Sequence, residues 1–179
     1  MKKALFFDRD GTLIRDVPYL SNPEQVSLFP DTKGVLSSAR DMGFLLFLFT
    51  NQSGIGRGYY TMKEVNTIHD RLLSDLNLGK DLFTGIKVAP EVPDQQSNYR
   101  KPSPKYLLEM IDAYQLDPLH TWMIGDRTSD IKAGLNAGIR VAGLKTSQLY
   151  DEEMALLLKQ NGSHAYPNLR SVWDLISKQ

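Results

Sequence analysis

The chain has 179 residues, 41% of them apolar, and its 21 lysines and arginines balance 21 acidic residues. This length predicts one domain over residues 1–179 with a hydrophobic core of its own. The balanced charge excludes a global field that would attract nucleic acid or acidic membranes, so we expect neither as a partner. The lack of cysteine excludes disulfides and thiolate chemistry, and it suits a reducing compartment.

The apolar runs are too short for a signal peptide or a membrane span. Only four apolar residues follow Met-Lys-Lys before Asp8, which leaves no hydrophobic region for secretion. The longest later run, Phe44–Phe49, is far below the roughly 20 residues that cross a bilayer. We therefore expect a cytoplasmic protein, and we expect it to be monomeric.

Strand and helix signals alternate along the chain, and this order predicts an α/β fold: a three-layer α/β/α sandwich with a mostly parallel sheet. Unbroken apolar runs indicate buried strands, whereas capping residues, initial prolines and terminal glycines mark helices. In chain order we expect a strand at Leu5–Phe7, a helix at 30–41, a strand at Phe44–Phe49, a helix at 61–76, a strand at 86–89, a helix at 103–114, a strand at 122–124, a helix at 131–136, a strand at 139–144, and closing helices at 152–160 and 171–178.

Some side chains within these elements have expected positions. The helix at 103–114 should bury one apolar face, made of Leu107, Leu108, Ile111 and Tyr114. His69, inside the helix at 61–76, is interpreted as a surface or packing residue without a ligand role. The polar loop Pro90–Pro102 is about as long as loops become without a function.

Polar residues follow the predicted strands in four groups. These groups are Asp8 with Asp10, Thr50–Gly54, Arg100 with Lys101, and Gly125–Asp130. Ligands bind at the carboxyl ends of strands in open α/β sheets, so the four groups converge if the strands are adjacent and parallel.

The chemistry of the groups is complementary. Carboxylates such as Asp8, Asp126 and Asp130 provide hard oxygen ligands that suit Mg²⁺. Thr50 and Lys101 provide donors for a phosphoryl oxygen. Asp8 is then a plausible in-line nucleophile in phosphoryl transfer, and Asp10 a general acid and base.

The ordered set Asp8-Arg9-Asp10-Gly11-Thr12, Thr50, Lys101 and Gly125-Asp126 to Asp130 resembles the haloacid dehalogenase-like phosphatases over nearly the whole chain. The resemblance implies the fold of that family with a minimal cap. It also implies Asp8 as nucleophile, Asp10 as acid and base, and Thr50 with Lys101 as phosphoryl-binding residues. By the same analogy, Mg²⁺ is bound by Asp8, the backbone carbonyl of Asp10 and Asp126, with Asp130 outside the direct ligands.

A narrower resemblance rests on the Asp8–Thr12, Thr50–Gly58 and Arg100–Pro102 segments. They look like the subfamily of D-glycero-D-manno-heptose-1,7-bisphosphate 7-phosphatases and histidinol phosphatases, which implies a small phosphorylated metabolite as substrate. Positions that contact substrate in this subfamily correspond here to Asp16, Tyr19, Asn51, Gln52, Ser53, Arg100 and Arg127.

The loop before Arg100 departs from that subfamily. Its members usually carry cysteines and a histidine there that bind zinc, whereas residues 89–99 contain neither. Structural zinc requires four ligands, mostly sulfur or nitrogen, and this loop offers only Glu91 and Asp94, so we expect no zinc.

Several other functions stay open. Within the same enzyme class, the substrate could be histidinol phosphate or another small phosphate ester. A non-catalytic phosphate-binding module is disfavoured because binding does not require an acid and base at Asp10. A receiver domain would carry its phosphoacceptor in mid-chain, and a phosphomutase would need a cap insertion between Thr12 and Thr50.

Overall fold

The computed structural model describes residues 1–93, 98–147 and 149–178. Its centre is a six-stranded sheet in which every neighbouring pair of strands is parallel. The strand order is β3-β2-β1-β4-β5-β6. The strands are β1 (Lys2–Phe7), β2 (Leu45–Asn51), β3 (Gly85–Ala89), β4 (Leu116–Gly125), β5 (Arg140–Leu144) and β6 (Ala165–Tyr166).

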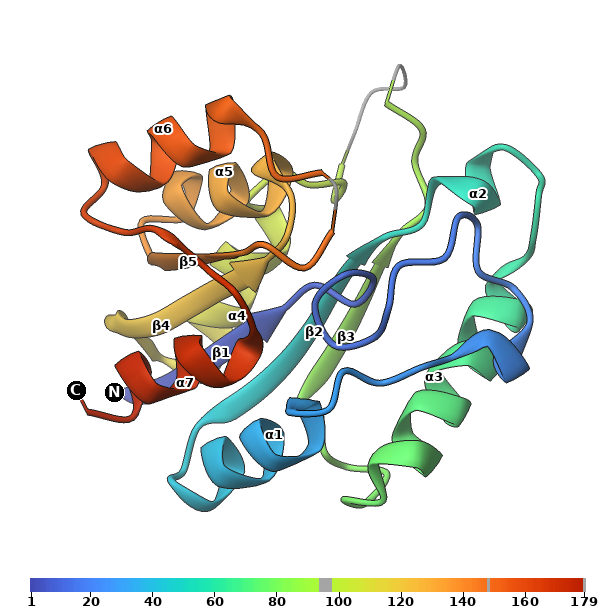
Figure 1. The fold of residues 1–179 in the computed structure, drawn as a ribbon, viewed down its shortest axis with the longest axis horizontal. Coiled ribbons are helices and arrows are strands. Elements are labelled where there is room, and N and C mark those ends of the chain that lie inside the picture. The colour runs from blue at the N-terminus through green and yellow to red at the C-terminus, as the bar shows by residue number, and fades with distance from the viewer. Residues whose placement is uncertain (94–97, 148, 179) are drawn as a thin grey trace.

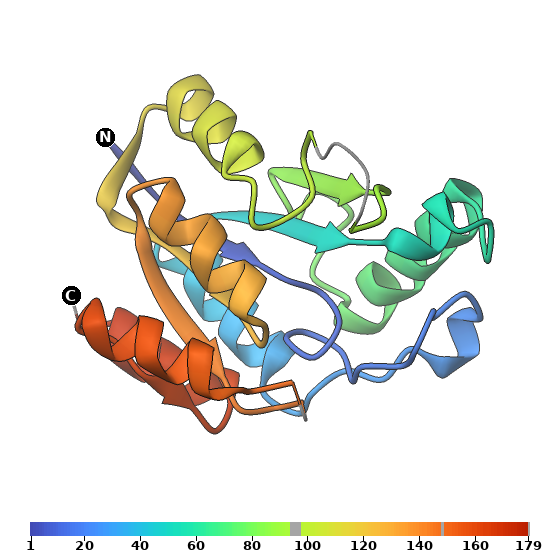
Figure 2. The ribbon, with the colours of Figure 1, turned by 90° about the horizontal axis from the view of Figure 1, so that it is seen from above.

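Helices cover both faces of this sheet, as Figures 1 and 2 show. One face is covered by α1 (Thr32–Asp41), α3 (Met62–Leu76) and α7 (Leu169–Ile176). The other is covered by α4 (Lys105–Tyr114), α5 (Thr128–Asn136) and α6 (Glu152–Gln160). Two short helices, η1 (Pro23–Gln25) and α2 (Ser53–Gly56), lie in connections. The predicted three-layer α/β/α sandwich is confirmed.

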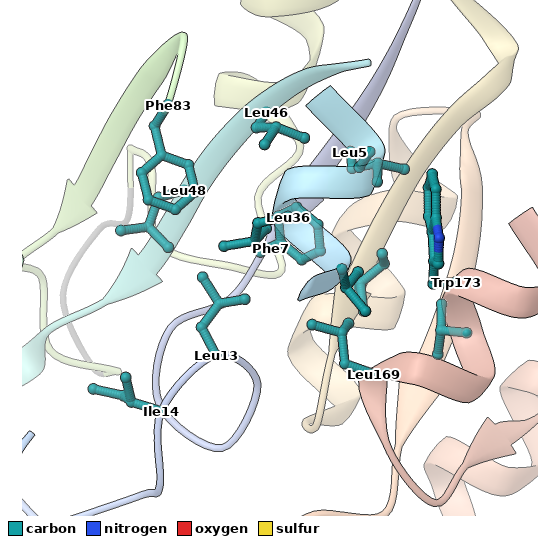
Figure 3. Close-up of a cluster of buried hydrophobic side chains, with 14 of the residues drawn as sticks. Leu5, Phe7, Leu13, Ile14, Leu36, Leu46, Leu48, Phe83, Leu169 and Trp173 are labelled. Carbon is teal, nitrogen blue, oxygen red and sulfur yellow. The ribbon is translucent and has the colours of Figure 1, made fainter. Parts of the chain in front are cut away.

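The alternation of side chains along β1 explains the two cores. Leu5 and Phe7 face the cluster completed by α1 and α7, whose Leu36 and Trp173 appear beside them in Figure 3. Phe6 points to the opposite face and stacks on Phe47 of β2 with ring centroids 4.6 Å apart. All the residues of β1 after Lys3 are buried, and the strand lies in the interior of the sheet between β2 and β4.

Several features differ from the sequence prediction, and strand β4 begins at Leu116 rather than at residue 122. Leu108 is 46% exposed, because it lies about 100° around the helix from the buried Leu107. Helix α5 begins at Thr128 rather than residue 131, since the Asp130 carboxylate accepts a hydrogen bond from the Arg127 backbone N–H at 3.0 Å. The short elements η1, α2 and β6 were not predicted; with three, four and two residues they are too short to show a periodicity.

No helix in the described part of the chain is long and apolar enough to span a bilayer.

Candidate active site

The strand order places the predicted residues at one edge of the sheet. Strand β1 lies between β2 and β4. The chain adds β2 and β3 on one side of β1 and then β4, β5 and β6 on the other, which makes the carboxyl end of β1 a topological switch point. A cavity of about 80 Å³ opens there. Its lining residues are Asp8, Asp10, Thr50, Asn51, Ser53, Arg100, Lys101, Arg127, Ser129 and Asp130. All four predicted groups therefore converge, and Ser129 of the fourth group, to which the sequence analysis assigned no role of its own, also lines the cavity.

Lys101 is the electrostatic centre of this cavity. Its Nζ lies 2.6 Å from Asp8 Oδ1 and 2.7 Å from Asp130 Oδ1, and it donates to the Phe49 carbonyl at 2.7 Å. Asn51 fixes the Lys101 backbone, since its amide donates to the Lys101 carbonyl at 3.1 Å and accepts from the Lys101 N–H at 3.0 Å. The Asn51 side chain is thus engaged in placing the lysine.

The buried charges change one another's proton affinity. Burial raises the pKa of Asp8 to about 8; Lys101 opposes this, and the carboxylates of Asp130 and Asp126 add to it. Burial, with the nearby charge of Asp130, raises the pKa of Asp126 to about 6. Burial lowers the pKa of Lys101, but Asp130 and Asp8 more than offset it, so that the ammonium is held charged. One cation thus faces an excess of carboxylates.

The carboxylates fit a divalent cation. Asp8, Asp126 and Asp130 are buried and offer oxygens within 4.8 Å of one another. Neither Asp126 oxygen has a hydrogen-bond partner of good geometry among the described residues, and the Ser147 side chain is the one donor that lowers its pKa; a buried carboxylate is costly unless it is paired or binds a metal. Asp130 already contacts Lys101 and the Arg127 backbone.

Gly11 gives Asp126 its space. It has φ +80°, a conformation that favours glycine. A Cβ atom at this position would overlap the Asp126 carboxylate. The glycine of the motif after β1 therefore matters both for the turn and for the approach of the Asp126 side chain.

Two side chains, other than Lys101, donate hydrogen bonds to the Asp10 carboxylate. Arg9 approaches it with Nη2 at 2.9 Å and Nε at 3.1 Å from Oδ2. Gln52 donates to the same oxygen at 2.8 Å and to Thr50 Oγ1 at 2.8 Å, while its carbonyl accepts from Tyr60 at 2.6 Å. Arg9 is fully buried, and the sequence analysis did not assign it a role.

The second buried partner that was missed is His69 on α3, 3.3 Å from Arg9 Nη1 through its Nε2 atom. Only 6% of this side chain is exposed. A sequence signal exists, because the buried positions of α3 follow helical periodicity and His69 is one of them: Val65, Ile68, His69, Leu72 and Leu76.

The predicted substrate-contacting residues other than Arg100 line a second cavity of about 250 Å³ beside the first. Asp10, Asn51, Ser53 and Arg127 belong to both cavities. Asp16, Tyr19 and Gln52 line the second only, and Arg100 lines the first. Arg127 Nη2 lies 3.1 Å from Asp16 Oδ2, which joins the loop after β1 to the loop after β4.

The segment after β3 is ordered by local contacts in its described part. Glu91 Oε1 accepts hydrogen bonds from the Tyr99 N–H at 3.0 Å and the Asn98 N–H at 3.2 Å. Arg100 Nη1 donates to the Glu91 carbonyl at 3.1 Å, and the ammonium of Lys87 lies 3.6 Å from the centre of the Tyr99 ring. Asp94, the other acidic residue of the predicted loop, lies outside the described residues.

Comparisons with known proteins agree with this arrangement. A family model described as HAD-hydrolase-like matches residues 98–172. The D-glycero-beta-D-manno-heptose-1,7-bisphosphate 7-phosphatase of Helicobacter pylori strain 26695 is 39% identical over 77% of this chain and 80% of that protein. A protein of Thermoplasma volcanium described as probably the D-glycero-D-manno form of this enzyme is 36% identical over 70% of this chain and 86% of its own. The chain belongs to this family of HAD-like phosphatases.

Solved structures place the fold in the same family. A D,D-heptose 1,7-bisphosphate phosphatase from B. bronchiseptica, complexed with magnesium and phosphate, superposes with a TM-score of 0.84 over 98% of both chains at 24% identity. A putative HAD-like phosphatase from Mesorhizobium loti gives a TM-score of 0.76, covering 98% of this chain and 85% of its own at 26% identity. HAD phosphatases are Mg²⁺-dependent phosphoric monoester hydrolases, and this chain has their fold and class.

Proposed function

We propose that this HAD phosphatase hydrolyses the 7-phosphate of D-glycero-D-manno-heptose 1,7-bisphosphate, with Asp8 as the nucleophile. The observation that carries the mechanism is the buried cluster in which Lys101 contacts Asp8 and Asp130 beside the unpaired carboxylate of Asp126. The identity to relatives named for this reaction supports the substrate.

The two steps use the two carboxylates that follow β1. A carboxylate oxygen of Asp8 attacks phosphorus, the bond from phosphorus to the sugar oxygen breaks, and Asp10 gives that oxygen its proton. In the second step Asp10 takes a proton from water, the water oxygen attacks phosphorus, and the aspartyl oxygen leaves. Inorganic phosphate is released, and both side chains return to their starting states.

The positive groups around Asp8 reduce repulsion between a carboxylate and an anionic phosphate. The Lys101 ammonium contacts Asp8 directly. The neutral hydroxyl of Thr50 lines the same cavity and can donate a hydrogen bond to a phosphoryl oxygen. Asp8, the Asp10 backbone carbonyl and Asp126 would hold Mg²⁺, with Asp130 kept at Lys101 and outside the direct ligands. Bound there, the cation adds positive charge that neutralises the carboxylates and the phosphoryl oxygens.

The rest of the substrate would occupy the second cavity. Arg127, which lines both cavities, and Arg100, which lines the first, provide cations, which suits a second phosphate. Asp16, Tyr19 and Ser53 line the adjoining wall with groups that can bind sugar hydroxyls. The Gln52 amide is bonded to Asp10 and Thr50, and Asn51 to Lys101, so we assign both to ordering the site.

We further propose that residues 1–179 act as a single-domain monomer that needs Mg²⁺ and no zinc. The segment 89–99 lacks cysteine and histidine, and Glu91 connects both sides of it by hydrogen bonds to Asn98 and Tyr99. Zinc therefore has no expected ligand set in this segment. The cytoplasmic location stays a prediction from composition.

The deciding experiment is phosphate release with Mg²⁺ from heptose 1,7-bisphosphate anomers, histidinol phosphate, hexose phosphates and an aryl phosphate. A kcat/KM for heptose bisphosphate at least ~100-fold above the others, about 2.7 kcal/mol of discrimination, supports the substrate. Weak activity of similar size on every compound would refute the substrate while keeping the phosphatase. Asp8→Asn should abolish turnover of every compound, and retained turnover would refute the nucleophile.

A further inference from the structure

We infer that Arg9 and His69 are positioning residues that hold the Asp10 carboxylate for its acid and base steps. This inference rests on the proposed role of Asp10 and extends it to a side chain on α3, the helix that follows α2. Neither residue lines the cavity in which the phosphate would bind, so both act through Asp10.

The first step is the geometry of Arg9. Its guanidinium is fully buried and its three nitrogens are all engaged. Nε and Nη2 contact the Asp10 carboxylate at 3.1 and 2.9 Å, and Nη1 contacts His69 Nε2 at 3.3 Å. A planar group fixed at both ends cannot pivot freely, and this arrangement holds the carboxylate bound to it in one orientation.

The second step is the state of His69. Burial and the charge of Arg9 lower the pKa of His69 to about 4, so the ring is neutral at pH 7. Guanidinium nitrogens only donate hydrogen bonds, so Nε2 must be the acceptor and the proton must be on Nδ1. His69 therefore offers a lone pair to Arg9 and adds no second positive charge beside it.

The third step is that a second side chain, Gln52, also holds Asp10. Gln52 donates to the same Oδ2 atom that Arg9 Nη2 contacts, and Tyr60 fixes the orientation of the Gln52 amide. An apolar residue in place of His69 would leave a guanidinium N–H without its acceptor, and an unsatisfied buried donor costs free energy. Arg9 would then rotate and carry Asp10 with it.

The test compares His69→Leu, which removes the acceptor, with His69→Gln, which restores one near the position of Nε2. An aryl phosphate is the probe, because its good leaving group makes hydrolysis of the phosphorylated enzyme the step that most needs Asp10. We expect His69→Leu to lower kcat at least tenfold with KM within about twofold, and His69→Gln to recover most of the loss. Acid quenching should show phosphorylated enzyme accumulating in His69→Leu, as in Asp10→Asn.

Leu72→Ala is the matched control, because Leu72 is buried one turn further along α3. It should lower the melting temperature yet leave kcat and the phosphorylated fraction unchanged at the assay temperature. The inference is overturned if His69→Leu keeps the wild-type kcat, if Leu72→Ala slows turnover equally, or if His69→Gln is no faster than His69→Leu. If Asp10→Asn itself keeps full turnover, the proposed role of Asp10 is what fails. Should His69→Leu not fold, His69→Asn replaces it, because its shorter side chain does not extend to the position of Nε2, 3.3 Å from Arg9 Nη1; the inference is overturned if His69→Asn keeps the wild-type kcat.

Discussion

Replacing Lys101 by methionine should reveal how strongly one ammonium holds the site together. The substitution keeps the length of the side chain but removes the charge that contacts Asp8 at 2.6 Å and Asp130 at 2.7 Å. Both carboxylates are buried. Removing one partner of a buried ion pair costs about 3–5 kcal/mol, which is a large part of the 5–15 kcal/mol typical of a whole domain.

The loss should depend on pH in a defined direction. Burial already raises the pKa of Asp8 to about 8, and removal of Lys101 takes away the group that lowers it. The folded state then holds a proton that the unfolded chain releases near pH 4, so the free energy of unfolding falls as pH rises from about 4 through 8. The wild type shows the same fall between pH 4 and 8, because its own Asp8 pKa is already about 8, so the two proteins diverge only as the pH passes that value. We expect the cost of Lys101→Met to be larger at pH 9 than at pH 7.

Urea unfolding at both pH values, without and with Mg²⁺, measures this cost. Lys132→Met is the control, because the ion pair of Lys132 with Glu153 is exposed and such pairs contribute only about 0–1 kcal/mol. Saturating Mg²⁺ at about 100 times its Kd should return about 2.7 kcal/mol to a protein that still binds it. A cost for Lys101→Met below about 1 kcal/mol, or the same cost at both pH values, would refute this reasoning.

Three further predictions follow from single contacts. In Gly11→Ala the new Cβ would overlap the Asp126 carboxylate, so thermal unfolding should show no stabilisation by Mg²⁺. Gly43→Ala is the control, because Gly43 also has φ +80° but has open space around it; it should lower the free energy of unfolding by only about 1–2 kcal/mol. Glu91→Gln weakens a charge-assisted acceptor of two loop N–H groups, so KM should rise several-fold with kcat unchanged in steady-state assays; an unchanged KM would contradict it. The pKa of His69 is lowered to about 4 in the folded state, so as pH falls the unfolded chain takes up a proton before the folded protein does. The free energy of unfolding should therefore fall by up to about 3 kcal/mol as pH drops from 6.5 to 4. Urea titrations at several pH values measure this fall, and His69→Gln should remove it.

The fold was predictable because its strands are buried on both faces. Residues of β1 and β2 form unbroken apolar runs that end in polar motifs, and such runs identify central parallel strands. The same rule placed Asp8 and Asp126 at one edge of the sheet. Strand β6 has two residues, and no pattern of period two can be recognised in so short a segment.

Contacts between residues far apart in the sequence could not be predicted from the spacing of motifs alone. Lys101 is 93 positions from Asp8, and its role in the sequence analysis came from resemblance rather than from geometry. Arg9 was missed because a charged residue between two aspartates looks like a solvated loop residue. Its buried guanidinium contacts His69, 60 positions away, and only the packing of α3 against the loop after β1 brings the two together.

Two buried cations, Lys101 and Arg9, contact different carboxylates of the site. Lys101 contacts Asp8 and Asp130, whereas Arg9 contacts Asp10. Each aspartate of the motif after β1 therefore has its own buried cation, and the carboxylates are kept apart as nucleophile and as acid and base. Asp126 has no cation in contact with it among the described residues. A divalent cation bound beside it would neutralise this remaining buried negative charge. Charge balance thus connects the requirement for Mg²⁺ to the separate orientations of Asp8 and Asp10.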